Sequence, residues 1–213
     1  KDEPRVSIRA RVCADAIEVA GADRVVTIDL HAPQIQGFFR IPVDDLYALP
    51  VLGKAIKAKK LQNLVVVSPD TGFVKQARRY ATLLQCNLAI GDKERINHDE
   101  NAEILQIIGD VKGKTAMIVD DFAISAGTLV EIANTLMENG ANAVYAAITH
   151  GVFAPGTKER IDDSPITKLL VTDSIETQPT PMSDKVEIVS VAAYLGEAIR
   201  RIHNRESISV LFS

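Results

Sequence analysis

The sequence predicts an α/β protein in which parallel sheets are flanked by helices. Short apolar runs of the size of buried strands alternate with segments whose apolar residues recur at helical spacing. Most polar clusters directly follow one of the apolar runs. In a parallel sheet covered on both faces, ligands bind at the carboxyl ends of the strands. The alternation therefore predicts the fold, and the polar clusters predict a ligand site at the strand ends.

Turn residues and apolar spacing place the elements in order. The first helix begins at Ser7, a good N-cap residue, and ends at Gly21. A highly polar segment, 91–101, is expected to form a surface loop, and residues 40–50, which contain two prolines, a connection. Helices are expected at 7–20, 51–59, 74–84, 129–139, 155–161 and 191–203, and strands at 25–28, 64–67, 88–90, 104–108, 116–119, 143–149, 169–172 and 186–190.

Composition excludes several classes of protein. The 213 residues suffice for one large or two small domains, and 46% hydrophobic with 24% charged residues is typical of globular proteins. A net charge of −4 with scattered Lys and Arg argues against a nucleic-acid partner. There is no apolar run of about 18 residues for a membrane span, and no signal peptide is visible. We expect Cys13 and Cys86 to be small buried hydrophobes in a reducing, cytoplasmic setting.

The most informative stretch is 117–128, which reads Met-Ile-Val-Asp-Asp-Phe-Ala-Ile-Ser-Ala-Gly-Thr. An apolar run predicts a strand that ends near Asp120 and Asp121, and a turn of small residues then leads into a helix. Unpaired N–H groups and the positive end of the dipole make such a helix start suitable for phosphate. Gly127 lets the backbone approach closely, because it has no Cβ.

The two carboxylates suggest what accompanies the phosphate. Carboxylates accept hydrogen bonds from sugar hydroxyls, and they also hold Mg²⁺ through water. A ribose 5-phosphate would satisfy both the carboxylates and the turn. The pattern leaves a second interpretation open, in which the stretch is a strand-to-helix turn without a ligand, because an Asp pair and a Gly turn are common in α/β proteins.

A resemblance extends this interpretation. Val119-Asp120-Asp121 with Ser125-Ala126-Gly127-Thr128 resembles the phosphoribosyl-binding loop of type I phosphoribosyltransferases. The whole chain resembles one branch of that superfamily, the ribose-phosphate pyrophosphokinases or phosphoribosyl pyrophosphate (PRPP) synthetases. The resemblance implies a phosphoribosyltransferase-like fold and transfer of diphosphate from ATP to ribose 5-phosphate, with Mg²⁺ as cofactor. It assigns the ribose hydroxyls to Asp120 and Asp121, and the 5-phosphate to Ser125, Ala126, Gly127 and Thr128.

Three further blocks resemble this family. Asp29-Leu30-His31-Ala32, with 34–39, resembles a signature whose His lies at the ATP–Mg²⁺ site, and 68–72 resembles the pyrophosphate loop, whose Asp coordinates Mg²⁺. The resemblance thus implies that His31 and Asp70 handle the metal. Lys93 and Arg95 match a loop that folds over the transferring diphosphoryl group, which makes them the catalytic candidates. Without the resemblance, the residue patterns favour simpler interpretations of these three blocks. His31 would cap a strand end, 68–72 would be a plain turn, and 93–95 would be a solvated charged face.

Two departures from the family pattern keep other hypotheses open. Phe73 stands where a second Gly is usual, so either the backbone differs or the loop binds diphosphate less well. Ile124 stands where a third Asp is usual. Both fit a non-catalytic synthetase-like subunit or partner that binds sugar phosphate. Ile124 also fits an ordinary phosphoribosyltransferase that uses PRPP on a base.

The two ends of the chain carry the remaining expectations. By resemblance, residues 1–47 are the C-terminal remnant of a first phosphoribosyltransferase-like domain, and 48–213 are the second, which carries the ribose 5-phosphate loop. The resemblance also implies a homo-oligomer, a hexamer with composite sites. Ser207 and Ser209, with Arg5, match a regulatory anion site between subunits that takes inorganic phosphate or ADP.

Overall fold

The structure, a computed structural model, describes residues 9–95, 103–176 and 182–212, with the side chains of 93–95 and 103–105 left outside the description. Its centre is a seven-stranded sheet in the order β5-β4-β3-β6-β7-β8-β9. Every neighbouring pair is parallel except β4 and β5, which are antiparallel. The strands are β3 (Leu64–Ser68), β4 (Asn87–Arg95), β5 (Glu103–Ile108), β6 (Thr115–Ala123), β7 (Ala143–Gly151), β8 (Ile166–Thr172) and β9 (Val186–Val189).

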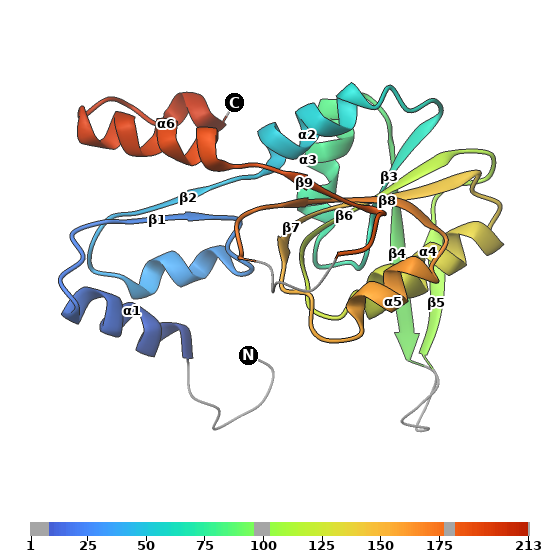
Figure 1. The fold of residues 1–213 in the computed structure, drawn as a ribbon, viewed down its shortest axis with the longest axis horizontal. Helices are drawn as coiled ribbons and strands as arrows, with labels where there is room; N and C mark the ends of the chain where they lie inside the picture. Colours follow the sequence, from blue (N-terminus) through green and yellow to red (C-terminus); the bar gives the residue numbers. More distant parts are fainter. Residues whose placement is uncertain (1–8, 96–102, 177–181, 213) are drawn as a thin grey trace.

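Helices cover both faces of this sheet, as the sequence predicted. α2 (Leu49–Ala58) and α3 (Val74–Leu84) lie on one face, and α4 (Gly127–Glu138) and α5 (Thr157–Asp162) lie on the other (Figure 1). The central strands are apolar on both sides, as parallel strands between two helical layers must be. In β6, Ile118 belongs to the cluster under α4, while Met117 belongs to the cluster under α2 and α3.

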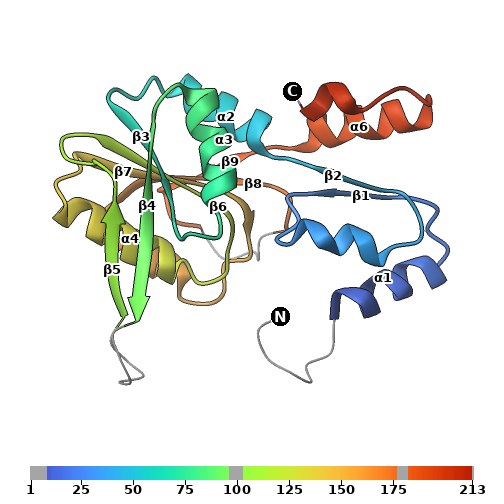
Figure 2. The same ribbon diagram turned by 180° about the vertical axis from the view of Figure 1, so that it is seen from behind.

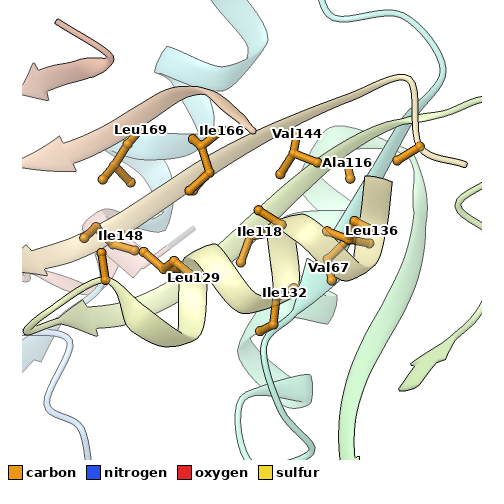
Figure 3. Close-up of a cluster of buried hydrophobic side chains, with 14 of the residues drawn as sticks. Val67, Ala116, Ile118, Leu129, Ile132, Leu136, Val144, Ile148, Ile166 and Leu169 are labelled. Carbon is orange, nitrogen blue, oxygen red and sulfur yellow. The ribbon is translucent and has the colours of Figure 1, made fainter. Parts of the chain in front are cut away.

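The cluster under α4 shows how the periodicities of strand and helix meet. Leu129, Ile132 and Leu136 recur at helical spacing and point from α4 toward the sheet (Figure 3). Ile118 and Val144 from neighbouring strands meet them there, and all five side chains are at most 1% exposed. This packing holds the start of α4 at the end of β6.

A smaller unit lies beside the main sheet. β1 (Val25–Ile28) and β2 (Val43–Leu46) form a two-stranded parallel sheet. The helix α1 (Arg9–Val19) precedes β1 in the chain, and the 3₁₀ segment η1 (Pro33–Phe38) lies between the two strands. α6 (Ala192–His203) lies on the opposite side of this sheet from α1, followed by η2 (Ser209–Phe212) (Figures 1 and 2). Val191 and Ala198 share a buried cluster with Ile28 and Leu46. The C-terminal helix therefore returns to the N-terminal sheet.

The structure corrects several expected elements. Residues 40–50 contain the strand β2, which local sequence conceals because two Asp residues occupy its centre and Asp is rare in strands. β4 continues to Arg95, so the first part of the expected loop at 91–101 is a strand, and this strand contains Lys93 and Arg95. β6 continues through Asp120 and Asp121 to Ala123, because β7 pairs with it as far as Gly151.

The last described segment is the 3₁₀ turn η2. The expectation of two buried cysteines is wrong for Cys13, which is exposed on α1, while Cys86 is half-buried. Among the described helices, none combines the length and apolar character that a membrane crossing requires.

The core packing of β6 sets a stability prediction. Ile118→Ala should lower the free energy of unfolding by about 2–5 kcal/mol, because a fully buried side chain is lost and a cavity remains. Urea denaturation measures the difference. Ile199→Ala is the control, because Ile199 is 59% exposed on α6, and its change should be within about 1 kcal/mol. Equal effects of the two substitutions would contradict the described core.

Candidate functional site

A pocket of about 580 Å³ opens at the carboxyl ends of β3 and β6. Parallel topology explains its position, because β3 and β6 are neighbours and their exit turns meet at one edge. The pocket collects every residue that the sequence assigned to substrate or metal. Its lining includes His31, Asp70, Asp120, Asp121, Ser125, Ala126, Gly127 and Thr128, together with the two departures Phe73 and Ile124.

The turn between β6 and α4 forms one end of this pocket. Ala126 takes the left-handed conformation, with φ 56° and ψ 12°, and α4 begins at Gly127. The first N–H groups of a helix have no partner inside the helix, so this end of the pocket carries backbone donors and the positive end of the α4 dipole. The hydroxyls of Ser125 and Thr128 lie on the same turn. An anion of phosphate size suits these donors.

The connection from β7 to α5 supports the turn from behind. The N–H groups of Val152 and Ala154 donate to the carbonyls of Ala123 (2.9 Å) and Ile124 (2.7 Å). Arg160 of α5 donates through Nη1 to the carbonyl of Ser125. Arg160 could not be predicted from the sequence as a support of this turn, because it lies 35 residues from Ser125 and no local pattern connects the two.

Two adjacent carboxylates form the other end of the pocket. The Asp121 N–H donates to Oδ1 of Asp120 at 2.9 Å. Burial, followed by the negative charge of Asp121, raises the pKa of Asp120 to about 8. Asp121 is itself only 8% exposed. In the free protein the ionised form of Asp120 is thus disfavoured, and a nearby cation or the hydroxyls of a sugar would favour it.

His31 reaches the pocket from the smaller unit. Its Nδ1 lies 2.7 Å from Oδ2 of Asp121, and its ring meets Phe122 edge-on with centroids 5.1 Å apart. The side chain is 74% exposed. Because Nδ1 faces Asp121, a ligand would approach Nε2. His31, expected to bind the metal, and Asp121, expected to bind the sugar, are therefore in direct contact.

The turn after β3 shows which backbone conformation Phe73 adopts. Phe73 lies at the N-cap of α3 with φ −91° and ψ −2°, a conformation open to any residue. Its N–H donates to Oδ1 of Asp70 at 2.9 Å, and Ser68 Oγ donates to the Asp70 carbonyl at 2.7 Å. The backbone therefore suits a Phe, and the Asp70 side chain accepts from the residue just before α3 at the edge of the pocket.

Other expected site residues lie outside the pocket or outside the described part. The backbones of Lys93 and Arg95 lie in β4, opposite Leu105 and Glu103, and their side chains are not among those described. Arg5 lies outside the described residues. In the C-terminal segment, Ser207 Oγ accepts a hydrogen bond from the Ser209 N–H at 3.2 Å. Neither serine lines the pocket.

Comparison with known proteins defines the family. Residues 96–213 match the family model described as the phosphoribosyl synthetase-associated domain. The chain is 48% identical, over 212 residues, to the ribose-phosphate pyrophosphokinase of Oceanobacillus iheyensis, and 47% identical to that of Rhizobium meliloti. The matches include the whole of this chain and 67% and 69% of the two relatives.

A solved structure agrees with these relatives. The phosphoribosylpyrophosphate synthetase from Mycobacterium smegmatis superimposes with a TM-score of 0.87 at 35% identity. The match covers 95% of this chain and 66% of that protein. The present chain thus spans about two thirds of the length of its relatives.

Fold and pocket together define an α/β protein with a phosphate-type loop and a carboxylate pair at the strand ends. With the comparisons, the particular family follows: the chain belongs to the ribose-phosphate pyrophosphokinases. The family, the enzyme class and the α/β fold expected from the sequence are confirmed.

The raised pKa of Asp120 predicts how stability depends on pH. The folded protein keeps this carboxyl protonated up to about pH 8, whereas an unfolded Asp releases its proton near pH 4. The free energy of unfolding should therefore fall as pH rises from 4 to 8, by at most about 1.4 kcal/mol per pH unit from this group. Asp120→Asn should remove that contribution and be more stable than the wild type at pH 8.

Urea denaturation at several pH values tests this sign. Asp110→Asn is the matched control, because a hydrogen bond from Lys114 lowers the pKa of Asp110 and its loss should not stabilise the protein at pH 8. If Asp120→Asn were less stable than the wild type across the whole pH range, the raised pKa of Asp120 in the folded protein would be contradicted.

Proposed function

We propose that the chain works as a ribose-phosphate pyrophosphokinase, transferring the β,γ-diphosphoryl group of ATP to the 1-hydroxyl of ribose 5-phosphate, which gives PRPP and AMP. The observation that carries this proposal is the pocket, in which a carboxylate pair and a phosphate-type helix start face the same space. Ribose 5-phosphate has hydroxyls at one end and a dianion at the other. Relatives named ribose-phosphate pyrophosphokinase support the same substrate.

Each end of the sugar phosphate then has a partner in this chain. The N–H groups at the start of α4, with the hydroxyls of Ser125 and Thr128, bind the 5-phosphate. Asp120 and Asp121 accept hydrogen bonds from the ring hydroxyls. These contacts orient O1 toward the space lined by His31 and Asp70, where ATP binds. Holding both reactants in line supplies much of the rate enhancement in this type of reaction.

The side chains around the pocket fit Mg²⁺. Asp70, Asp120 and Asp121 offer carboxylate oxygens, the ligands that Mg²⁺ prefers, and their mutual repulsion favours a cation. Among the described residues there is no ready cluster of three or more ligands. This is consistent with a Mg²⁺ ion that arrives with ATP, because Mg²⁺ sites at phosphates use one or two carboxylates. When bound, the ion would offset charge on the diphosphoryl group, with Asp70 and His31 as its holders.

Lys93 and Arg95 are proposed as the catalytic pair. Both belong to the end of β4, and two cations there would stabilise the charge on the transferring group. The reaction needs no covalent intermediate, because the 1-hydroxyl itself attacks the β-phosphorus and AMP leaves. Ile124 occupies the rim of the pocket and is 53% exposed. An apolar residue there favours, as second candidate, a non-catalytic relative that binds the sugar phosphate without turnover.

We also propose the domain and assembly scheme that the sequence suggested. Residues 1–47 belong to a first phosphoribosyltransferase-like domain, and 48–213 form the second. The separate pairing of β1 with β2 and the share of the relatives that the chain spans support the division, although α6 crosses back to the first unit. The protein is proposed to be a cytoplasmic homo-oligomer, a hexamer, in which phosphate or ADP binds near Arg5, Ser207 and Ser209.

The proposal predicts a large kinetic effect at the end of β4. Lys93→Ala combined with Arg95→Ala should lower the rate of AMP formation from ATP and ribose 5-phosphate by at least about a thousandfold, because the transferring charge loses both cations. The affinity for ribose 5-phosphate should change little. Unchanged turnover in the double variant would refute the assignment. Sugar-phosphate binding without AMP from the wild-type protein, even when extended to the length of its relatives, would favour the non-catalytic alternative.

The hydrogen bond from Arg160 to the turn at 125–128 predicts an effect on the affinity for ribose 5-phosphate. Arg160→Gln should raise the Kd for ribose 5-phosphate by about tenfold, because the turn loses the charged donor on the Ser125 carbonyl. Calorimetric titration measures the Kd. Lys158→Gln is the control on the same helix, since Lys158 pairs with Asp162 away from the turn, and it should leave the Kd within about twofold.

A further inference from the structure

A half-buried polar junction joins the smaller unit to the main sheet, beside a pocket that His31 also lines. His150, near the end of β7, is half-buried and faces the turn after β1. Its Nε2 lies 3.0 Å from the carbonyl of Ile28 and 3.2 Å from the carbonyl of Asp29. Its Nδ1 lies 2.8 Å from Oγ of Ser174, beyond β8. One imidazole therefore connects three segments that are far apart in the chain.

The hydrogen-bond pattern determines which ring nitrogen carries the proton. Carbonyl oxygens only accept hydrogen bonds, so Nε2 is protonated and donates to the turn. Ser174 Oγ lies 2.8 Å from Nδ1 and also 3.0 Å from the Thr149 carbonyl, which accepts from Thr172 Oγ1 at 2.6 Å as well. Since Nε2 carries the proton of a neutral imidazole, Nδ1 is the acceptor and the Ser174 hydroxyl is its donor. We therefore assign His150 the tautomer with its proton on Nε2.

Asp29 secures the same turn from its other side. Its Oδ2 accepts hydrogen bonds from Thr149 Oγ1 at 2.6 Å and from the Ala48 N–H at 3.1 Å. Its own N–H donates to the Leu46 carbonyl at 2.8 Å. Its backbone has φ 46°, a left-handed conformation that is costly for a residue other than Gly. The hydrogen bonds from β7 and from the segment after β2 hold this conformation in place.

His31 depends on this turn for its position. It follows Asp29 by two residues, and its side chain is 74% exposed, so few packing contacts hold it. The Leu30 N–H between them donates to Oδ1 of Asp45 at 3.1 Å. Beyond the edge contact with Phe122, the ring is held by its 2.7 Å contact with Asp121. A small rotation of the turn would therefore break the contact between His31 and Asp121.

We propose that His150, with Asp29, is a positioning residue that sets His31 against Asp121 by holding the turn between the two units. Its effect on turnover rests on the function proposed above. Its effect on the geometry of His31 does not, so the two are tested separately.

The test uses a pair of amide variants. In His150→Gln the amide nitrogen takes the place of Nε2 and still donates to the turn, whereas in His150→Asn it takes the place of Nδ1 and the donation is lost. We expect His150→Asn to lower the rate of AMP formation by about tenfold or more and His150→Gln to recover most of it, while the Kd for ribose 5-phosphate stays within about twofold in both. His203→Asn, on an exposed residue of α6, is the matched control.

Two further measurements separate positioning from a purely structural role. In a His31→Ala background, His150→Asn should cause no further loss of turnover, because its effect passes through His31. If the losses of turnover from His31→Ala and His150→Asn multiplied in the double variant, the proposal would be overturned. Long-range ¹H–¹⁵N spectra of the imidazoles, recorded without substrate, should show the Nε2–H tautomer of His150 and a changed His31 signal in His150→Asn but not in His150→Gln.

These spectra decide the proposal even if the wild-type protein forms no AMP. Absence of AMP would contradict the proposed function. An unchanged His31 signal in His150→Asn would contradict the positioning role, whether or not AMP is formed. If His150→Asn does not fold, Ser174→Ala replaces it, because this variant keeps the ring and removes the donor to Nδ1, together with the bond from Ser174 Oγ to the Thr149 carbonyl. It should shift the His31 signal in the same direction by a smaller amount, and no shift would overturn the proposal.

Discussion

The contact between His31 and Asp121 is the one on which the rest of the site depends. It joins the smaller unit, which carries His31, to β6, which carries the carboxylate pair. Asp121 is nearly buried at a strand end, and its neighbour Asp120 holds a proton to about pH 8 because the two charges are crowded and poorly solvated. An imidazole donor at one edge and an anion-binding helix start at the other leave a space that suits a ligand with both hydroxyls and phosphate.

In this site, a parallel sheet with an apolar core places charged and polar groups at the ends of its strands. Apolar packing between β6 and α4 makes the framework rigid, and only the last residues of each strand are polar. The carbonyls of residues 123–125 are then held by hydrogen bonds, which leaves the first N–H groups of α4 available at the pocket. Stability comes from the buried side chains, while the unfavourable features, the left-handed Ala126 and the carboxylate pair, are concentrated at the pocket.

Local patterns in the sequence were sufficient for much of the fold, whereas His31 and Asp70 were assigned to the pocket by the family resemblance. The strand before Asp120 and the turn at 125–128 follow from apolar spacing and small residues, and the topology then brings Asp70 beside them. Long-range pairing was not accessible: β6 continues past Asp120 because β7 pairs with it. Arg160 and His150 were missed as supports for the same reason, since their partners lie 35 and more than 120 residues away.

The central claim is that one pocket recognises both ends of ribose 5-phosphate. Calorimetric titration of this chain with ribose 5-phosphate, ribose and inorganic phosphate tests it most directly. Two-ended recognition predicts that ribose 5-phosphate binds at least about a hundredfold more tightly than either ribose or inorganic phosphate, because the second end binds without a new loss of translational freedom. Equal affinities for ribose 5-phosphate and inorganic phosphate would mean that the carboxylate pair does not bind the sugar and would contradict the account.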